Sequence, residues 1–292
     1  MTAIHFPTDS ERSARHERIR QAIAEHPPMP AYYRDLLPYV QDPDIGFDQL
    51  SRIIRNDPGV TMNILKMANT TYFCGTGRVD SLQQAFVRLG SRRLFQIVIA
   101  HGLASRLAVE LVGYGLAPRI LLRHSVGVAI TSELLARRLE QPTREMLFTA
   151  ALLHDMGKVV LDPFVAEVRP VFDALLRHTD RPFDDLEREV LGITHPEAGA
   201  QLMKRWNFAE ELVDIVACHH HPDLAISFQS ETMMVHLADT LIYSQGMGDG
   251  IDGLRYQVYN DSSKRLGLKS RDVEAVASGA LDQLRELEAL MT

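Results

Sequence analysis

The sequence has little cysteine and no excess of positive charge, and each shortage excludes a class of protein. Its two cysteines, Cys74 and Cys218, lie far apart in a chain of 292 residues, so a disulfide framework is not expected. The formal net charge of −7 argues against a nucleic-acid binder that is held by bulk phosphate attraction. We therefore expect no nucleic-acid partner.

Long hydrophobic runs are missing as well. The most apolar stretch, LFQIVIAHGLA at residues 94–104, is too short and too interrupted to span a bilayer. The sequence also opens without the pattern of a signal peptide. We therefore expect a cytoplasmic protein in a reducing compartment, without a membrane partner.

Clean two-residue alternation of polar and apolar side chains is scarce, whereas helical periodicity runs through the chain. The predicted fold class is therefore all-α. A proline-rich stretch ends the first helix, and residues 113–118 (GYGLAP) form the best internal boundary. Helices are expected at about 11–25, 31–40, 46–55, 58–69, 82–89, 91–109, 119–140, 143–155, 163–178, 184–191, 195–206, 209–220, 230–245, 252–265 and 271–290.

The stretch AALLHDMGKVVL (150–161) places an imidazole and a carboxylate inside a hydrophobic run. Burying both is unfavourable unless a hydrogen bond, a substrate or a metal compensates. In a continuous helix His154 and Asp155 would point about 100° apart, so both reach one metal only near a helix end or bend. We expect Gly157 to supply that irregularity. Lys158 would then project near any phosphate bound to the metal.

Further candidate ligands follow in the second half of the chain, on apolar helices or at helix ends. Thr194 and Glu197 have the spacing of a capping box, which places His195 in the first turn of a helix. Imidazoles and carboxylates suit Fe, Mn, Zn, Co or Ni. Taken singly, each candidate also has an ordinary explanation, such as a bond to a carbonyl, a polar helix end or an arginine partner. Taken together they indicate a common site, made of His124, His154, Asp155, His195, His219, His220 and Asp239.

The order His124, His154-Asp155 with Gly157-Lys158, and then Asp239 resembles the H…HD…D arrangement of the HD superfamily of metal-dependent phosphohydrolases. In that superfamily these residues bind a divalent metal, and the lysine helps to hold a phosphate. His195, His219 and His220 resemble the extra ligands of the two-metal HD-GYP branch. However, HPDLAISFQ follows His220 where that branch has its glycine-tyrosine-proline loop, which argues against cyclic-dinucleotide hydrolysis.

Two longer stretches resemble the HDOD domain, the HD-related output domain of bacterial signalling proteins. They are NDPGVTMNILKMANTTYFCGTGRVDSLQQAFVRLG (56–90) and GITHPEAGAQLMKRWNFAEELVDIVACHHHP (192–222). The resemblance implies an N-terminal helical subdomain packed on an HD-like helical bundle. We accordingly divide the chain into a polar N-terminal segment (1–26), the N-terminal helical half of HDOD (27–112), the HD-like bundle (113–245) and C-terminal helices (246–292).

Two functions remain open at this point. The first is a regulatory module of signal transduction that retains an HD-type metal site with one or two ions of Fe, Mn or Zn. Because no receiver, kinase or cyclase domain fits in the remaining length, its signalling partner would act in trans. The second is a metal-dependent phosphohydrolase for a nucleotide or another phosphate ester, with Asp155 as metal ligand and Lys158 steadying the phosphate. We favour the first, because the resemblance is to a largely regulatory family.

Overall fold

The structure, a computed structural model, describes residues 6–28, 46–54, 58–69, 77–140, 145–248, 250–253, 255 and 261–291. Within these ranges the chain is helical and forms no strand beyond an isolated bridge between Leu111 and Leu116. The predicted all-α fold class is confirmed. The first helices are α1 (Asp9–Glu25), α3 (Phe47–Ile54), α4 (Pro58–Ala68) and α5 (Leu82–Leu107), and α5 is bent at Gly90, where one helix was expected to end.

The second part of the chain contributes most of the helices. In the described ranges these are α6 (Ile120–Arg138), α7 (Glu145–Leu153), α8 (Met156–Glu167), α9 (Arg169–His178), α10 (Phe183–Leu191), α11 (His195–Arg205), α12 (Glu210–Cys218), a 3₁₀ turn (Pro222–Leu224), α13 (Gln229–Ser244), α14 (Ser262–Arg265) and α15 (Ser270–Met291). No helix in the described ranges combines the length and the hydrophobicity needed to cross a bilayer.

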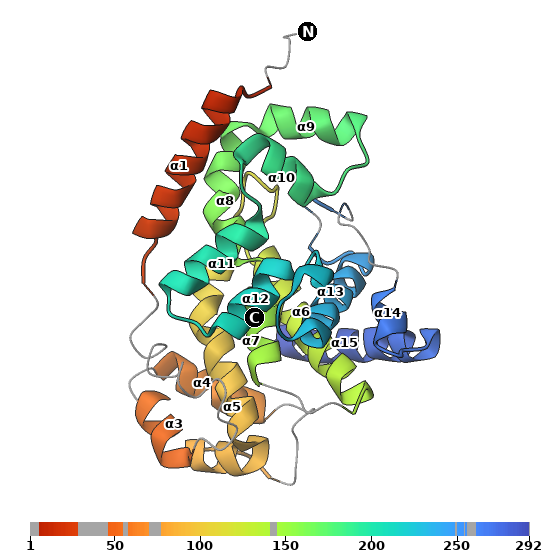
Figure 1. Cartoon of the computed structure of the whole chain (residues 1–292). Helices are drawn as coiled ribbons and strands as arrows, with labels where there is room; N and C mark the ends of the chain where they lie inside the picture. Colours follow the sequence, from red (N-terminus) through yellow and green to blue (C-terminus); the bar gives the residue numbers. More distant parts are fainter. Residues whose placement is uncertain are drawn as a thin grey trace.

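The helices form an N-terminal layer that packs on a larger bundle. In Figure 1, α3, α4 and the start of α5 lie at one end of the molecule, and α9 and α10 lie at the other. Helix α5 joins the two parts, since it packs against α3 and α4 and also against α6, α7 and α8. One cluster of buried apolar side chains extends from Ile19 in α1 to Leu284 in α15. The core is thus shared by both parts.

Three expected helices differ in the structure or cannot be compared. The helix predicted for 163–178 is wrong in its bounds, because α8 already begins at Met156, continues through Pro163, and is followed after Val168 by the separate helix α9. The helix predicted for 252–265 is also wrong at its start, since residues 252, 253 and 255 are not helical, and in the described part of this range the helix is Ser262–Arg265. Residue 252 instead turns inward, where its carboxylate is fully buried. The helix expected at 31–40 lies outside the described residues.

Helix α1 lies along one flank of the bundle, against α8, α10 and α11 (Figure 1). Most of its side chains are polar. The side that packs on the bundle contains Ile19, Ile23 and the largely buried Arg15. The Arg15 guanidinium donates to the carbonyl of Val190, at 2.9 Å, near the end of α10. The last carbonyls of a helix lack partners within the helix, and a cation there also suits the helix dipole.

We expect Arg15→Ala to lower the free energy of unfolding by about 1.5–3 kcal/mol, because a charged donor to a buried carbonyl is lost. Urea-induced unfolding measures the effect. Arg20→Ala is the matched control, since the Arg20 side chain is 63% exposed and pairs with Glu17 on the same helix. Its effect should stay within about 0.5 kcal/mol. Equal losses in the two variants would show that Arg15 does not hold α1 in place.

Candidate metal centre

The HD dipeptide lies at a break between two helices. Helix α7 ends at Leu153 and α8 begins at Met156, so His154 and Asp155 occupy the turn between them. Both side chains can therefore point to the same side, as the metal-site hypothesis requires. The expectation that Gly157 causes the break is wrong, because Gly157 lies inside α8.

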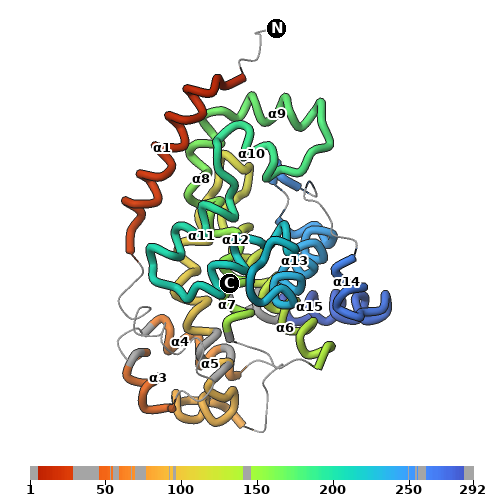
Figure 2. Tube along the Cα trace, in the orientation of Figure 1, coloured from red at the N-terminus to blue at the C-terminus, as the bar shows by residue number. Residues whose placement is uncertain are grey.

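Gly157 serves instead to bring α8 and α11 together. A Cβ at this position would lie 1.9 Å from the carbonyl oxygen of His195 and 2.7 Å from the amide nitrogen of Gly199. Only a residue without a side chain permits such a close approach of two backbones. This contact places His195, the first residue of α11, beside Asp155. Figure 2 shows the traces of α8, α11 and α12 running close together near the middle of the molecule.

The first group of candidate ligands comes from α6, the α7–α8 turn and α13. The Nε2 atom of His124 lies 3.0 Å from Oδ1 of Asp239 and 3.6 Å from Oδ2 of Asp155. The Nε2 atom of His154 lies 3.4 Å from the same Asp155 oxygen. All four side chains are buried. The structure thus brings together His124, His154, Asp155 and Asp239.

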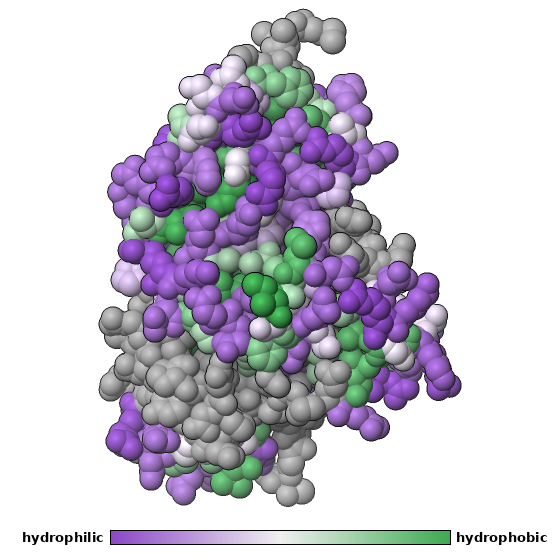
Figure 3. All heavy atoms as spheres, viewed as in Figure 1, coloured by the Kyte–Doolittle hydropathy of each residue, from purple (hydrophilic) through white to green (hydrophobic). Residues whose placement is uncertain are grey.

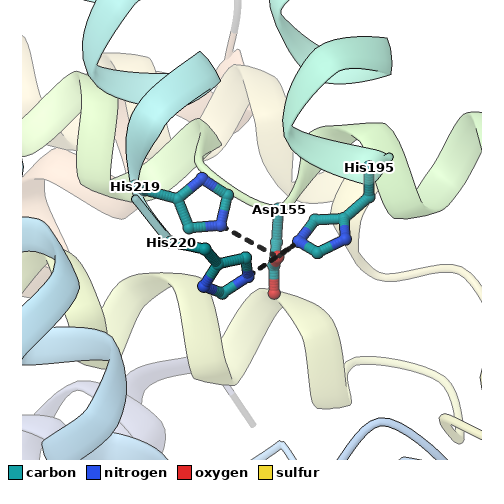
Figure 4. Close-up of side chains that lie close together, drawn as sticks. All are labelled: Asp155, His195, His219 and His220. Carbon is teal, nitrogen blue, oxygen red and sulfur yellow. Dashed lines mark hydrogen bonds and ion pairs between the residues drawn. The ribbon is translucent and has the colours of Figure 1, made fainter. Parts of the chain in front are cut away.

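The second group faces the other oxygen of Asp155. Figure 4 shows His195, His219 and His220 with their rings directed at this carboxylate. The Nε2 atom of His195 lies 3.3 Å from Oδ1 of Asp155, and that of His219 lies 4.0 Å from it. One ligand atom from each of the four residues lies within 4.8 Å of the others. Asp155 is therefore shared, with Oδ2 toward the first group and Oδ1 toward the second.

Three of the five histidine rings are fixed by backbone carbonyls. A carbonyl only accepts hydrogen bonds, so each of these rings carries its hydrogen on Nδ1 and directs the lone pair of Nε2 into the cluster. This is the orientation in which a neutral imidazole binds a metal. The bonds, 2.7–3.1 Å long, join His124 to Met247, His154 to Ala151 and His219 to Val216.

The converging lone pairs need a cation between them. The Nε2 atoms of His124 and His154 are 3.3 Å apart. In the described part of the chain, the buried atoms without a hydrogen-bond partner include Oδ1 of Asp155, Oδ1 of Asp239 and Nε2 of His219. Without metal, protons must supply the charge. Burial acts to lower the pKa of the His154 imidazole, but the carboxylates of Asp155 and Asp239 raise this pKa to about 10. The donor set and the unsatisfied atoms fit divalent transition metals.

Lys158 lies beside this cluster but is fully buried. Its Nζ atom donates to Oδ2 of Asp155 at 2.8 Å, to Oδ2 of Asp252 at 2.7 Å and to the hydroxyl of Tyr243 at 3.0 Å. Burial acts to lower the pKa of Lys158, but the two carboxylates raise it well above its usual value. In this conformation the ammonium is held by protein oxygens, so the role predicted for it with phosphate remains a prediction.

Sequence reasoning missed two buried acids that contact the cluster. Asp252 lies in a segment predicted as helix, although the glycines on either side, in GIDG, could have indicated a turn. Glu187, from α10, accepts from the ring of His195 at 2.7 Å and carried no local signal. His221, the third of the consecutive histidines, bonds to Asp184 at 2.7 Å and does not join the cluster.

Comparison with known proteins decides the family. The model of the HDOD domain matches residues 26–222, well over half of the chain. The chain belongs to the HDOD domain family. The HDOD match ends before Asp239, which belongs to the cluster, and before Asp252, which bonds to Lys158 beside it.

Solved structures share the HDOD fold. An HDOD domain protein of Geobacter sulfurreducens is 22% identical, with 97% of both chains covered and a TM-score of 0.76. A protein of Shewanella amazonensis SB2B, provisionally named a phosphohydrolase, is 24% identical, with 94% of this chain and 98% of that chain covered and a TM-score of 0.69. A protein of Marinobacter aquaeolei VT8, provisionally named for signal transduction, is 18% identical, with 99% and 67% covered and a TM-score of 0.69.

Among curated proteins, a protein of Treponema pallidum (strain Nichols) is 22% identical over 214 residues, which make up 70% of this chain. The match spans only 39% of the length of that relative. These likenesses establish the fold, while the chemistry of the cluster has to be argued from its own residues.

Proposed function

We propose that this HDOD protein is a regulatory module of signal transduction built around a buried two-metal centre. The observation that carries the proposal is the convergence of six other ligand side chains around the carboxylate of Asp155. Asp155, with His124, His154 and Asp239, would hold one ion. The same carboxylate would hold the second ion together with His195, His219 and His220.

Buried charge supports two ions rather than none. Asp155, Asp239, Glu187 and Asp252 are four buried carboxylates, and the ammonium of Lys158, which is bonded to Asp155 and Asp252, balances one of the four charges. Three negative charges therefore remain among these groups when the imidazoles are neutral. Uncompensated charge of this kind is strongly destabilising. Two divalent ions reduce the imbalance to a single positive charge, which a bound anion or hydroxide could offset.

Closure of the centre supports a regulatory rather than a catalytic role. All seven candidate ligands are at most 2% exposed. Metal sites that are closed by protein are typically structural, whereas catalytic sites keep an open position. A surface cleft of about 570 Å³ lies elsewhere, between α1, α11 and α12, and none of the seven lines it. On the face shown in Figure 3, most of the coloured residues are hydrophilic, and an apolar patch lies near the middle. The protein would transmit its signal by direct contact with a separate signalling protein, in trans.

The second candidate, a metal-dependent phosphohydrolase, is favoured by one observation. Two ligand groups share a carboxylate, as in two-metal sites that lower the pKa of a bound water and make hydroxide near neutral pH. For such chemistry Lys158 would have to exchange Asp252 for a phosphate oxygen. The contacts of Lys158 in this conformation favour the regulatory role.

Metal titration into the metal-free protein tests the proposal and separates the two candidates. We expect each bound ion of Mn, Fe or Zn to raise the free energy of unfolding by about 2.7 kcal/mol when the free metal is 100-fold above the Kd of that site. In the same samples, hydrolysis of p-nitrophenyl phosphate and of a nucleotide panel should not exceed that of Asp155→Ala. Turnover well above that variant would instead establish the phosphohydrolase, and no change in stability would contradict both.

A further inference from the structure

Glu187 is a fully buried acid outside the set of candidate ligands. Its Oε2 atom accepts two hydrogen bonds from one residue, the backbone amide and the ring Nδ1 of His195, both at 2.7 Å. Its Oε1 atom accepts from the hydroxyl of Tyr114 at 2.6 Å. In the described part of the chain Glu187 forms no ion pair with a lysine or an arginine. Its negative charge therefore faces the cluster through His195.

This anchor differs from those of the other fixed rings. His124, His154 and His219 donate Nδ1–H to neutral backbone carbonyls. His195 alone among these four donates to a carboxylate, and the same oxygen also fixes its backbone at the start of α11. A carboxylate on Nδ1 selects the tautomer whose Nε2 faces the metal and makes that nitrogen a stronger ligand.

Tyr114 fixes Glu187 in turn. Its ring is fully buried, and it lies in the turn that is closed by the bridge between Leu111 and Leu116. The backbone carbonyl of Tyr114 accepts from the amide of Ile251, one residue before Asp252, at 2.8 Å. Tyr114 therefore holds Glu187, which bonds to His195. It also holds the segment that carries Asp252, which bonds to Lys158.

We propose that Glu187 is a positioning residue that strengthens the second metal position selectively, with Tyr114 holding its carboxylate in place. The inference rests on the proposed two-metal centre. Glu187 is hydrogen-bonded to His195, which belongs to the second ligand group, and among the described residues it forms no hydrogen bond or ion pair with His124, His154, Asp155 or Asp239. Loss of the Glu187 charge should lower the affinity for one ion and leave the affinity for the other unchanged.

Metal stoichiometry in Glu187→Gln tests the selectivity. Glutamine keeps the shape and can still accept from His195, but it removes the charge. We expect one of the two ions to lose 10- to 100-fold in affinity while the other keeps its affinity, and Tyr114→Phe to show a smaller loss for the same ion. Glu197→Gln is the matched control, because Glu197 caps the same helix from a partly exposed position and should retain both ions. Retention of both ions at wild-type affinity in Glu187→Gln, or equal weakening of both, would overturn the proposal.

A readout without metal separates this inference from the proposed function. Long-range ¹H–¹⁵N NMR of the metal-free protein reports which ring nitrogen of His195 carries the hydrogen. We expect the Nδ1–H form in the wild type and in Glu187→Gln, and a mixture of forms in Glu187→Ala. A wild type that binds no metal but shows this contrast would contradict the two-metal centre and leave the positioning of His195 supported. Absence of the contrast would overturn the role of Glu187, whatever the metal content.

Discussion

Asp155→Ala is expected to reduce the bound metal to the background of a metal-free control. Asp155 faces both ligand groups, with Oδ2 near His124 and His154 and Oδ1 near His195 and His219. Its removal takes a ligand from both positions and also one partner from Lys158. Elemental analysis of the purified variant measures the result. His124→Ala should lose one ion and keep the other, since His124 belongs to the first group alone.

The matched control is His221→Ala, which removes an adjacent histidine that bonds to Asp184 and lies outside the cluster. It should keep the wild-type metal content. Asp155→Asn keeps the size of the side chain and an oxygen for Lys158, so it tests the same point if the alanine variant folds poorly. Wild-type metal content in both Asp155 variants would show that the shared carboxylate is not a ligand.

Gly157→Ala should be among the most destabilising single substitutions in the chain. The new Cβ would lie 1.9 Å from the backbone oxygen of His195, so α8 and α11 would have to separate. Overpacking against rigid backbone typically costs 1–3 kcal/mol and occasionally more, and at this separation we expect more than about 3 kcal/mol. Urea-induced unfolding measures the loss. The separation should also draw His195 away from Asp155 and lower the content of the second ion.

Gly279→Ala provides the control, because a Cβ there would meet only Leu134 at an ordinary 3.7 Å. Alanine also favours the helix by about 1 kcal/mol over glycine, so this variant should be as stable as the wild type or more stable. If Gly157→Ala were as stable as Gly279→Ala, the close approach of α8 and α11 would not be what positions His195.

Local patterns were enough to predict the all-α class and several helix ends. The capping box of Thr194 and Glu197 is present, and it places His195 in the first turn of α11 as expected. Such signals act over three or four residues, which is why a sequence reveals them. The candidate ligands were likewise recognisable, because imidazoles and carboxylates on apolar helices need a common explanation.

Features that depend on distant partners could not be predicted in this way. The role of Gly157 is set by α11, about 40 residues further along the chain. Glu187 looks like a surface residue of α10 until its bond to Tyr114, 73 residues away, is known. Asp252 bonds to Lys158, 94 residues earlier in the chain, and nothing local to Asp252 indicates that partner. In each case tertiary packing decides the role of the residue.

The metal content of the wild-type protein tests the central claim most directly. The protein should be purified without a histidine tag and analysed for Fe, Mn and Zn, before and after reconstitution. The account predicts about two equivalents of divalent metal per chain, as a shared carboxylate with two ligand groups implies. A clean absence of metal after reconstitution would contradict it, and the cluster would then be held by protons and hydrogen bonds alone.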